Sequence, residues 1–580
     1  MDEAFWNGGG WLTLLVFTPL LGAALTTVFS EETEADRLQI TRFALGVSLV
    51  TLALAAPLAV AFDPSAPGFQ FSGSGVGVPG GRTLVGVDGF SLPLVLLAAF
   101  VTPFAVLASA PPGVFSLKGP TLGAQAAGGG SVKALMACLL ASAGFVLGAL
   151  LAVDALSFFL FFELALIPTL LWLWWCASAE TRSEARRAAV RLAAPLVLSA
   201  ALLAAALWWM TGHVASSPEF AARIVATPPG APAPMATDLR VWLSLDWPSA
   251  PAEMFGLTAP SGAQTALFLA FLVAFAIKAG LWPTQGWLPT VLAAAPSGLA
   301  LFVAAAVIKL GLYGFLRFSF PMAPAASADF AWMMVALGAA GLIYGAGLAA
   351  TREPLRRRIG HFTVALMGVA LLGVFSGSER GVAGALLQLV SHGLGVTALL
   401  LLLQPNPLSQ PNPRPSGAPQ RPAPPSVGRA VAPAAILVFM LGMIGAPGGP
   451  GFVATALTLE GLIEGLVMGG FALDALGTGV WVGGALIGLL GLGLLILVWA
   501  AWRLQGRGLE FHGLRFGHVM WALPLGAAVL TLGVAPELLT ALSADAVARL
   551  IEAVGAGVDP TAAPGFESMG GDPARISGDG

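Results

Sequence analysis

Residues 297–315 read SGLALFVAAAVIKLGLYGF, and this stretch decides the class of the protein. A helix needs about 20 consecutive apolar residues to cross the roughly 30 Å hydrocarbon core of a bilayer. The stretch approaches that length and carries one charged side chain, Lys309, near its middle. A charge at mid-bilayer costs at least about 2.5–3.5 kcal/mol on insertion scales, so such residues usually face a polar interior. The stretch therefore predicts a membrane-spanning helix that lines a polar path.

The composition of the whole chain agrees with this prediction. Of its 580 residues, 57% are hydrophobic and 10% are charged, and the mean hydropathy is +0.85. Because soluble domains carry about 25% charged residues, a soluble globular protein is excluded. The net charge of -3 excludes a nucleic-acid binder that works by electrostatics. Cys138 and Cys176 lie in apolar runs and support neither a disulfide framework nor a thiolate metal site.

Fourteen stretches are long and apolar enough to cross a membrane, so we expect an all-α polytopic membrane protein. The predicted spans are residues 11–29, 40–62, 90–109, 134–153, 156–176, 188–210, 265–281, 297–320, 330–350, 359–376, 383–403, 432–457 (interrupted), 480–502 and 518–536.

The spans fall into consecutive regions. We expect three N-terminal helices with their loops, a first five-helix repeat, a second repeat that contains a Pro-rich loop, a fourteenth helix with a C-terminal segment, and a disordered tail. In the same order, these regions are residues 1–133, 134–320, 330–502 with the loop at 404–427, 503–564 and 565–580.

Lysine and arginine are unevenly distributed among the loops. Of the 27 in the chain, eighteen fall at loops that follow odd-numbered spans, and seven fall at even-numbered loops or in the C-terminal segment. The other two, Lys278 and Lys309, lie inside spans. Cytoplasmic loops carry the excess of positive charge. We therefore expect the odd-numbered loops in the cytoplasm and both termini on the periplasmic side of a bacterial inner membrane.

Proline and glycine interrupt two spans. The seventh runs into GLWPTQGWLP with Pro283, and the twelfth contains GAPGGPGFV with Pro447 and Pro450. Lipid does not tolerate the unpaired carbonyls that such breaks leave, so they are expected where a helix lines a polar cavity. The breaks lie five spans apart, and an odd repeat length gives two repeats of opposite orientation, as in ion transporters. The alternative is that these prolines only kink packed helices.

Three ionisable residues inside the spans are candidates for an ion path. Lys278 lies near the end of span seven, Lys309 in the middle of span eight, and Glu163 about two turns into span five. A desolvated lysine releases its proton more readily, and a nearby carboxylate stabilises the charged form, so a moving carboxylate would load or unload a proton. The alternatives are a structural ion pair, a snorkelling lysine, and a Glu163 that hydrogen-bonds only a neighbouring backbone.

Two further residues extend this set. His392 lies about nine residues into span eleven, and imidazole titrates near neutral pH, which suits a relay. The alternative is a neutral, buried histidine that bridges two helices. Asp154, at the start of span five, is an accessory candidate, with a place at the membrane interface as the alternative.

Six segments carry motifs that occur in order. They are LVGVDGFSLPLVLLAAFVTPFAVLAS (84–109), FFELALIP (161–168), FAIKAGLWPTQGWLP (275–289), APSGLALFVAAAVIKLGLYGFLRF (295–318), GALLQLVSHGL (384–394) and GAPGGPGFV (445–453). Together they resemble the antiporter-like subunits of respiratory complex I, from about residue 84 to residue 460. The first two segments look most like the M-type subunit, chain 4.

The resemblance implies roles for the buried residues. Glu163 and Lys278 match the coupled Glu–Lys pair of that family. Lys309 matches its central relay lysine, and His392 its relay histidine. The resemblance also implies fourteen helices with two inverted repeats, and proton translocation coupled to electron transfer elsewhere in an assembly of several membrane subunits. No cofactor or metal is expected in this chain.

The chain departs from the family pattern beyond the broken helices. Four family positions, a histidine, an aspartate, a histidine and a glutamate, are here Gln285, Thr290, Leu292 and Ala294. Leu366 replaces a histidine in span ten, and Thr455 stands where span twelve should carry a carboxylate. Glu460 lies five residues farther on, roughly 140° around a helix, and is an imperfect replacement. The input half of the path is therefore complete, and its exit half is in question.

The leading interpretation is a proton-translocating membrane subunit of a NADH:quinone oxidoreductase, part of an enzyme rather than a catalyst alone. One alternative is a subunit of a related cation/proton antiporter, a membrane-bound hydrogenase or an ion-driven carbon-uptake complex. Another is a structural subunit with a decayed pathway. Sodium ions remain an alternative to protons, because both travel along carboxylates and polar cavities.

Overall fold

The computed structural model describes most of the chain in helical segments. The described residues are 9–78, 81–110, 131–227, 233–254, 257–259, 261–403, 439, 442–443, 447–467, 491, 493–496, 498–499 and 516–558. The Pro-rich loop, most of predicted span thirteen, most of the first part of span twelve and the tail lie outside these residues.

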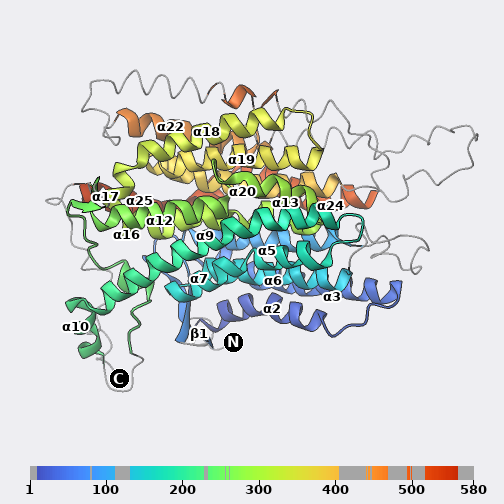
Figure 1. The fold of residues 1–580 in the computed structure, drawn as a ribbon, viewed down its shortest axis with the longest axis horizontal. Coiled ribbons are helices and arrows are strands. Elements are labelled where there is room, and N and C mark those ends of the chain that lie inside the picture. The colour runs from blue at the N-terminus through green and yellow to red at the C-terminus, as the bar shows by residue number, and fades with distance from the viewer. Residues whose placement is uncertain are drawn as a thin grey trace, which may run out of the picture.

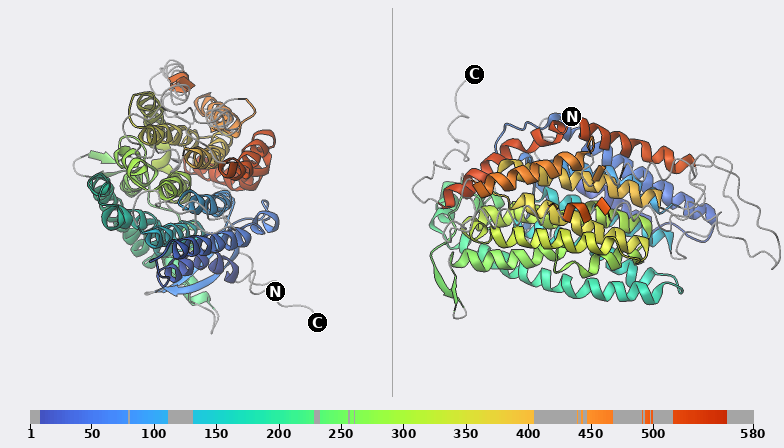
Figure 2. Two further views of the ribbon diagram at one scale, coloured as in Figure 1. Left: turned by 90° about the vertical axis from the view of Figure 1, so that its right-hand side faces the viewer. Right: turned by 90° about the horizontal axis from the view of Figure 1, so that it is seen from above.

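The helices lie side by side along the longest axis of the molecule, and most are seen nearly end-on in the turned view (Figures 1 and 2). In the described part of the chain, nine helices are long and apolar enough to cross a membrane, or ten with one bent pair. The longer helices are α2 (Gly10–Thr26), α3 (Glu34–Ala55), α5 (Ser91–Ala108), α6 (Val132–Leu151), α7 (Ala155–Leu164), α9 (Arg182–Ala215), α12 (Ala263–Ala279), α18 (Ala331–Ala349), α19 (Leu355–Val374), α20 (Glu379–Leu402), α22 (Pro450–Val467), α24 (Phe516–Val534) and α25 (Glu537–Val558).

The described helices account for most of the predicted spans. Predicted spans one to eleven and fourteen each coincide with a helix or with a run of broken helical segments. Helices α2 and α12, with 17 residues each, are shorter than a standard crossing. The described part of span twelve, α22, continues to Val467, ten residues beyond the predicted end. A multi-pass membrane protein is therefore confirmed.

Two small hairpins depart from the all-α expectation. Strand β1 (Gln70–Val78) pairs antiparallel with β2 (Gly81–Val87), and β3 (Ala252–Met254) pairs with β4 (Leu257–Ala259). The larger hairpin continues into an isolated bridge between Val85 and Ala152, at the end of α6. The sequence predicted a loop between its second and third spans, and it did not predict these strands.

Burial shows which helices lie at the centre of the bundle. The apolar windows of the broken helix Ser297–Met322 and of α20 are fully buried, and that of α19 is 94% buried. The apolar part of α9 is only 33% buried. The apolar part of the helical stretch Glu34–Ala61, which includes α3, is only 28% buried. The outer helices expose large apolar side chains, such as Val197 and Trp208 of α9, as expected of surfaces that face lipid or neighbouring membrane chains.

Three of the crossings that the structure describes in full are interrupted. A turn at residues 165–166 separates α7 from α8 (Ile167–Leu171), where Pro168 lacks a backbone donor. Helix α12 ends at Gly280, with φ of +65°, and the chain resumes as η2 (Gln285–Trp287) and α13 (Leu288–Ala294). In span eight, π-helical segments η3 (Val303–Val307) and η4 (Phe315–Ser319) flank α15 (Lys309–Gly314). The break in span seven was predicted, whereas the π segments were not.

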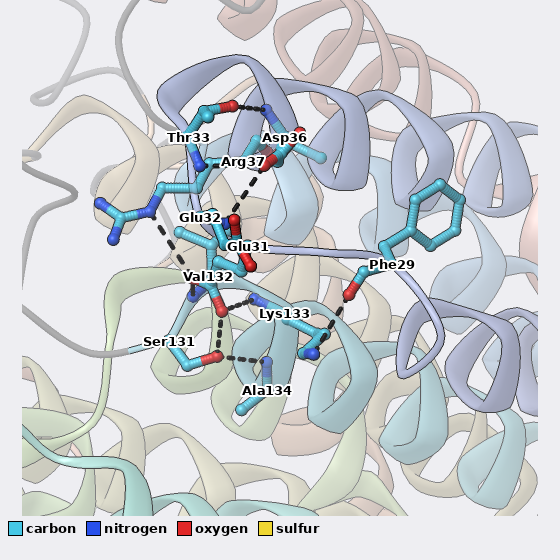
Figure 3. A network of polar contacts seen from close by, with 11 residues as sticks. Phe29, Glu31, Glu32, Thr33, Asp36, Arg37, Ser131, Val132, Lys133 and Ala134 are labelled. Carbon is cyan, nitrogen blue, oxygen red and sulfur yellow. Dashed lines mark hydrogen bonds and ion pairs between the residues drawn. The ribbon is translucent and has the colours of Figure 1, made fainter.

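One polar cluster joins the starts of α3 and α6 (Figure 3). The Glu31 carboxylate accepts hydrogen bonds from the Ser131 hydroxyl and the Val132 amide at the beginning of α6. Glu31 also lies 3.7 Å from the Arg37 guanidinium of α3, and Lys133 donates to the Phe29 carbonyl. Because a carboxylate at a helix N-terminus satisfies amides that lack helical partners, this cluster ties the start of α6 to the start of α3 and to the segment that follows α2.

Candidate functional site

Lys278 of α12 and Glu163 of α7 meet inside the bundle. The Lys278 side chain is fully buried, and its ammonium nitrogen lies 3.3 Å from Glu163 Oε2. The same nitrogen donates to the Phe162 carbonyl at 2.8 Å and lies 4.4 Å from the centre of the Phe162 ring. Both residues were predicted from the sequence, and the structure brings them into contact.

The break after α7 explains why the Phe162 carbonyl is free to accept this bond. In an unbroken helix, that carbonyl would accept from the amide four residues later. Here the regular helix ends at Leu164 and the chain turns before Pro168. The fully buried Lys278 therefore has three stabilising neighbours: a carboxylate, a carbonyl and an aromatic face.

A second centre joins Lys309 of α15 to His392 of α20. Lys309 Nζ and His392 Nδ1 are 2.6 Å apart, so one nitrogen donates its proton and the other accepts it. His392 Nε2 lies 3.3 Å from the Thr363 hydroxyl, and Lys309 Nζ lies 3.6 Å from Met367 Sδ, both on α19. In the described part of the chain, no acidic side chain forms an ion pair with Lys309.

The backbone around Lys309 is distorted where this centre forms. The Ile308 amide donates to the Val303 carbonyl, five residues earlier, as in a π-helix. Single π turns inside α-helices occur frequently at functional sites. The sequence predicted Lys309 and His392 but not Thr363 or Met367, because a threonine and a methionine in an apolar helix carry no signal of their own.

Asp154 has a structural role in the hairpin and the start of α7. Its carboxylate accepts from the Ser157 amide at 2.8 Å, as an N-cap, and from the Leu84 amide at 2.9 Å. Burial raises the pKa of this carboxyl, and the two amide donors act against that shift. Asp154 therefore ties β2 to α7 and makes no contact with Glu163 or Lys278 among the described residues.

Three residues of α20 and α22 carry buried polar oxygens. Gln388 lies one turn before His392 and donates to the Met443 carbonyl at 3.4 Å, while its Oε1 is buried without a partner among the described residues. The hydroxyls of Thr455 and Thr458 on α22 are also buried and also have no hydrogen-bond partner among the described residues. Glu460 is exposed, so it does not belong to this buried set. We call Gln388, Thr455 and Thr458 the α20–α22 seam.

Comparisons with known proteins show what these residues are similar to. Residues 152–478, more than half of the chain, match the family NADH:quinone oxidoreductase/Mrp antiporter, transmembrane. The chain belongs to this family. It is 29% identical over 462 residues to NADH-quinone oxidoreductase subunit M of Rhodobacter capsulatus, a match that covers 78% of this chain and 80% of that one. It is also 29% identical to NAD(P)H-quinone oxidoreductase chain 4 of a Synechococcus strain, of whose length it covers 63%.

Solved structures place the chain in the fold of the same family. A chain of respiratory complex I from Thermus thermophilus superposes with a TM-score of 0.67, at 24% identity, over 93% of this chain and 99% of that one. A chain of the Mrp complex from Dietzia sp. gives 0.66 at 18% identity, over 98% of this chain and 57% of that one. The fold is therefore that of the complex I antiporter-like membrane subunits.

The positions that depart from the family pattern are mostly buried. Gln285 is 6% exposed, and its Oε1 lacks a partner among the described residues. Leu292 and Leu366 are buried among apolar neighbours, and Thr290 donates to the Trp287 carbonyl. Pro450 begins α22 two residues after Gly448, whose φ is +89°. Span twelve is therefore broken just before Pro450, as predicted. The residue that follows the break at the family's carboxylate position is Thr455, which has a neutral hydroxyl.

One buried charged pair was not predicted from the sequence. Arg317, near the end of span eight, lies 2.7 Å from Asp88, which follows β2, and it also donates to the Tyr313 hydroxyl at 3.0 Å. The Tyr313 hydroxyl in turn donates to the Leu150 carbonyl at 3.2 Å. Arg317 was counted with the loop charges. A lone arginine at a predicted span end gives no sign of a partner 229 residues away.

Proposed function

We propose that this family member translocates protons as a membrane subunit of a NADH:quinone oxidoreductase assembly. The observation that carries the proposal is a pair of buried basic centres, Glu163–Lys278 and Lys309–His392, in the middle of a membrane bundle. Ionisable side chains are expensive in that position and usually mark an ion path. The relatives at 29% identity are subunits M and chain 4 of such oxidoreductases.

The first centre performs proton uptake. An ionised Glu163 stabilises the ammonium of Lys278, and a neutralised or displaced Glu163 weakens that stabilisation and promotes release of the lysine proton. Lys278 is held in place meanwhile by the Phe162 carbonyl, at 2.8 Å. The pair can therefore change its charge without a large movement of the lysine.

The second centre passes the proton across the bundle. Lys309 and His392 share a contact of 2.6 Å, so a proton can move between their nitrogens without any other group in between. Thr363 contacts the other ring nitrogen of His392 and completes a hydrogen-bonded chain from α15 through α20 to α19. A neutral amine beside a neutral imidazole is ready to accept one proton.

The exit follows the α20–α22 seam. From His392, Gln388 lies one turn nearer the beginning of α20, and the seam continues with the buried hydroxyls of Thr455 and Thr458. Buried oxygens without protein partners are the groups that internal water satisfies. The Arg380–Glu464 ion pair lies at the end of this route.

The complete topology belongs to the same proposal. Fourteen crossings with two inverted repeats of five helices agree with the nine described spans, with the two breaks and with the positions of α2, α12, α22 and α24. The distribution of basic residues supports both termini on the periplasmic side of a bacterial inner membrane. Protons would then enter from the side on which α9 and α19 begin.

A subunit of another assembly is the second candidate, because the fold alone does not separate it from the first. The TM-score to a chain of the Mrp complex is 0.66, and that to a chain of the membrane-bound sulfane sulfur reductase is 0.65, close to the complex I value. Copurification in mild detergent, with identification of the partners by mass spectrometry, separates the two. NADH- and quinone-binding subunits support the first proposal, and recovery with antiporter chains alone supports the second.

Loss of pumping tests the function itself. Glu163→Gln and Lys278→Ala, each in the assembled complex in native membrane vesicles, should cut proton pumping severely while the complex still assembles. The matched control is Glu184→Gln, which changes an exposed carboxylate at the beginning of α9. Normal pumping in both Glu163→Gln and Lys278→Ala would refute the assigned role of the pair.

A further inference from the structure

Ser199 stands between the two helices that carry the uptake pair. It lies near the middle of α9 and is fully buried. Its hydroxyl oxygen is 3.2 Å from Glu163 Oε1 and 3.3 Å from the Ala274 carbonyl oxygen. A serine hydroxyl has one proton, so it donates to only one of these two acceptors at a time. The choice between them depends on the charge of Glu163.

The charge dependence follows from the strength of the two hydrogen bonds. A hydrogen bond to an ionised carboxylate is roughly twice as strong as one between neutral groups. While Glu163 is ionised, the Ser199 hydroxyl therefore donates to Oε1. When Glu163 takes up a proton, its oxygens become weaker acceptors, and the Ala274 carbonyl competes on equal terms. The hydroxyl then turns toward α12.

The second acceptor lies on the segment that carries Lys278. Ala274 precedes Lys278 by four residues, one turn of α12. In the described part of the chain, Lys278 is the charged side chain that contacts Glu163, and α9 contributes the neutral Ser199. The state of the hydroxyl is thus coupled to the glutamate on one side and to the turn that bears the lysine on the other.

We propose that Ser199 is a positioning residue that stabilises the ionised form of Glu163 and so sets the pH at which the uptake pair takes up a proton. The inference rests on the proposed function of the pair and names a third member of it. Ser199 does not transfer the proton. It holds Oε1, while Oε2 faces Lys278 at 3.3 Å, so the two carboxylate oxygens have separate partners.

The test is a titration of Glu163 in the purified assembly. Infrared difference spectra recorded against pH report the carboxylic-acid band of Glu163, which is identified by its loss in Glu163→Gln. Ser199→Ala should move the midpoint of this band upward by about one pH unit, the effect of losing one hydrogen bond to a charged group. Ser199→Thr, which keeps a hydroxyl, should restore the midpoint.

The matched control is Ser48→Ala. Ser48 is also fully buried in a membrane helix, but its hydroxyl donates only to the Leu45 carbonyl of its own helix. This control should leave the midpoint unchanged. If Ser199→Ala fails to assemble, Ser199→Cys replaces it, because a thiol has nearly the same shape and is a weaker donor. Ser199→Cys should give a smaller shift in the same direction.

Two results would overturn the inference. One is an unchanged midpoint in both Ser199→Ala and Ser199→Cys, and the other is an equal shift in Ser48→Ala. Pumping by Glu163→Gln separates this failure from failure of the proposed function. If Glu163→Gln abolishes pumping while Ser199→Ala leaves the midpoint in place, only the role of Ser199 is wrong.

Discussion

The two buried lysines occupy the same bundle but differ in how their charge is compensated. Lys278 has a carboxylate at 3.3 Å, a backbone carbonyl at 2.8 Å and an aromatic face. Lys309 has a histidine at 2.6 Å and a thioether at 3.6 Å. A charged Lys278 has an opposite charge beside it, whereas a charged Lys309 has no carboxylate partner among the described residues to offset the cost of its desolvation. Under the proposed function, a proton would rest on the first centre and only pass through the second.

The largest expected effect concerns Lys309. Lys309→Met should lower proton pumping at least about a hundredfold, because the group that accepts the proton is gone. The same change should leave the stability of the assembly equal or higher, since an apolar side chain of similar length replaces a desolvated amine. Proton flux into vesicles and thermal unfolding of the purified assembly measure the two effects. A strong loss of stability would show instead that another charge in the assembly compensates Lys309.

The opposite behaviour is expected at the first centre. Glu163→Gln leaves the ammonium of Lys278 buried without its carboxylate and should lower the unfolding free energy by about 3 kcal/mol. The double variant Glu163→Gln with Lys278→Met removes both charges and should recover most of that loss, while pumping stays low. Thermal unfolding of the single and double variants checks this. Additive losses would contradict a direct interaction of the two side chains.

The α20–α22 seam gives a smaller effect. Gln388→Leu combined with Thr458→Val removes two of its buried oxygens and should slow pumping about tenfold, if water held by these groups carries the proton out. Thr397→Val is the matched control, because Thr397 is a buried threonine of α20 whose hydroxyl is satisfied by the Gly393 carbonyl. Equal pumping by the double variant and the control would place the exit elsewhere.

The sequence predicted the charged members of the site better than its neutral ones. Lys278 and Lys309 stand out in apolar stretches because a membrane tolerates few charges, and most of the predicted spans follow from length alone. Ser199, Thr363 and the Phe162 carbonyl could not be predicted. Serine and threonine are common inside membrane helices, and a backbone carbonyl becomes available only where the tertiary structure breaks a helix.

The smallest effect distinguishes the accessory acid from the pathway. Asp154 caps α7 and accepts from the Leu84 amide, away from both lysines. Asp154→Ala should lower the unfolding free energy by about 1–2 kcal/mol, the loss of a helix cap and of a buried hydrogen bond, and should leave pumping per assembled complex unchanged. Asp154→Asn should lose less stability, because asparagine also caps helices. Unfolding and proton flux are measured on the same preparation. A fall in pumping at unchanged stability would move Asp154 from the hairpin into the proton path.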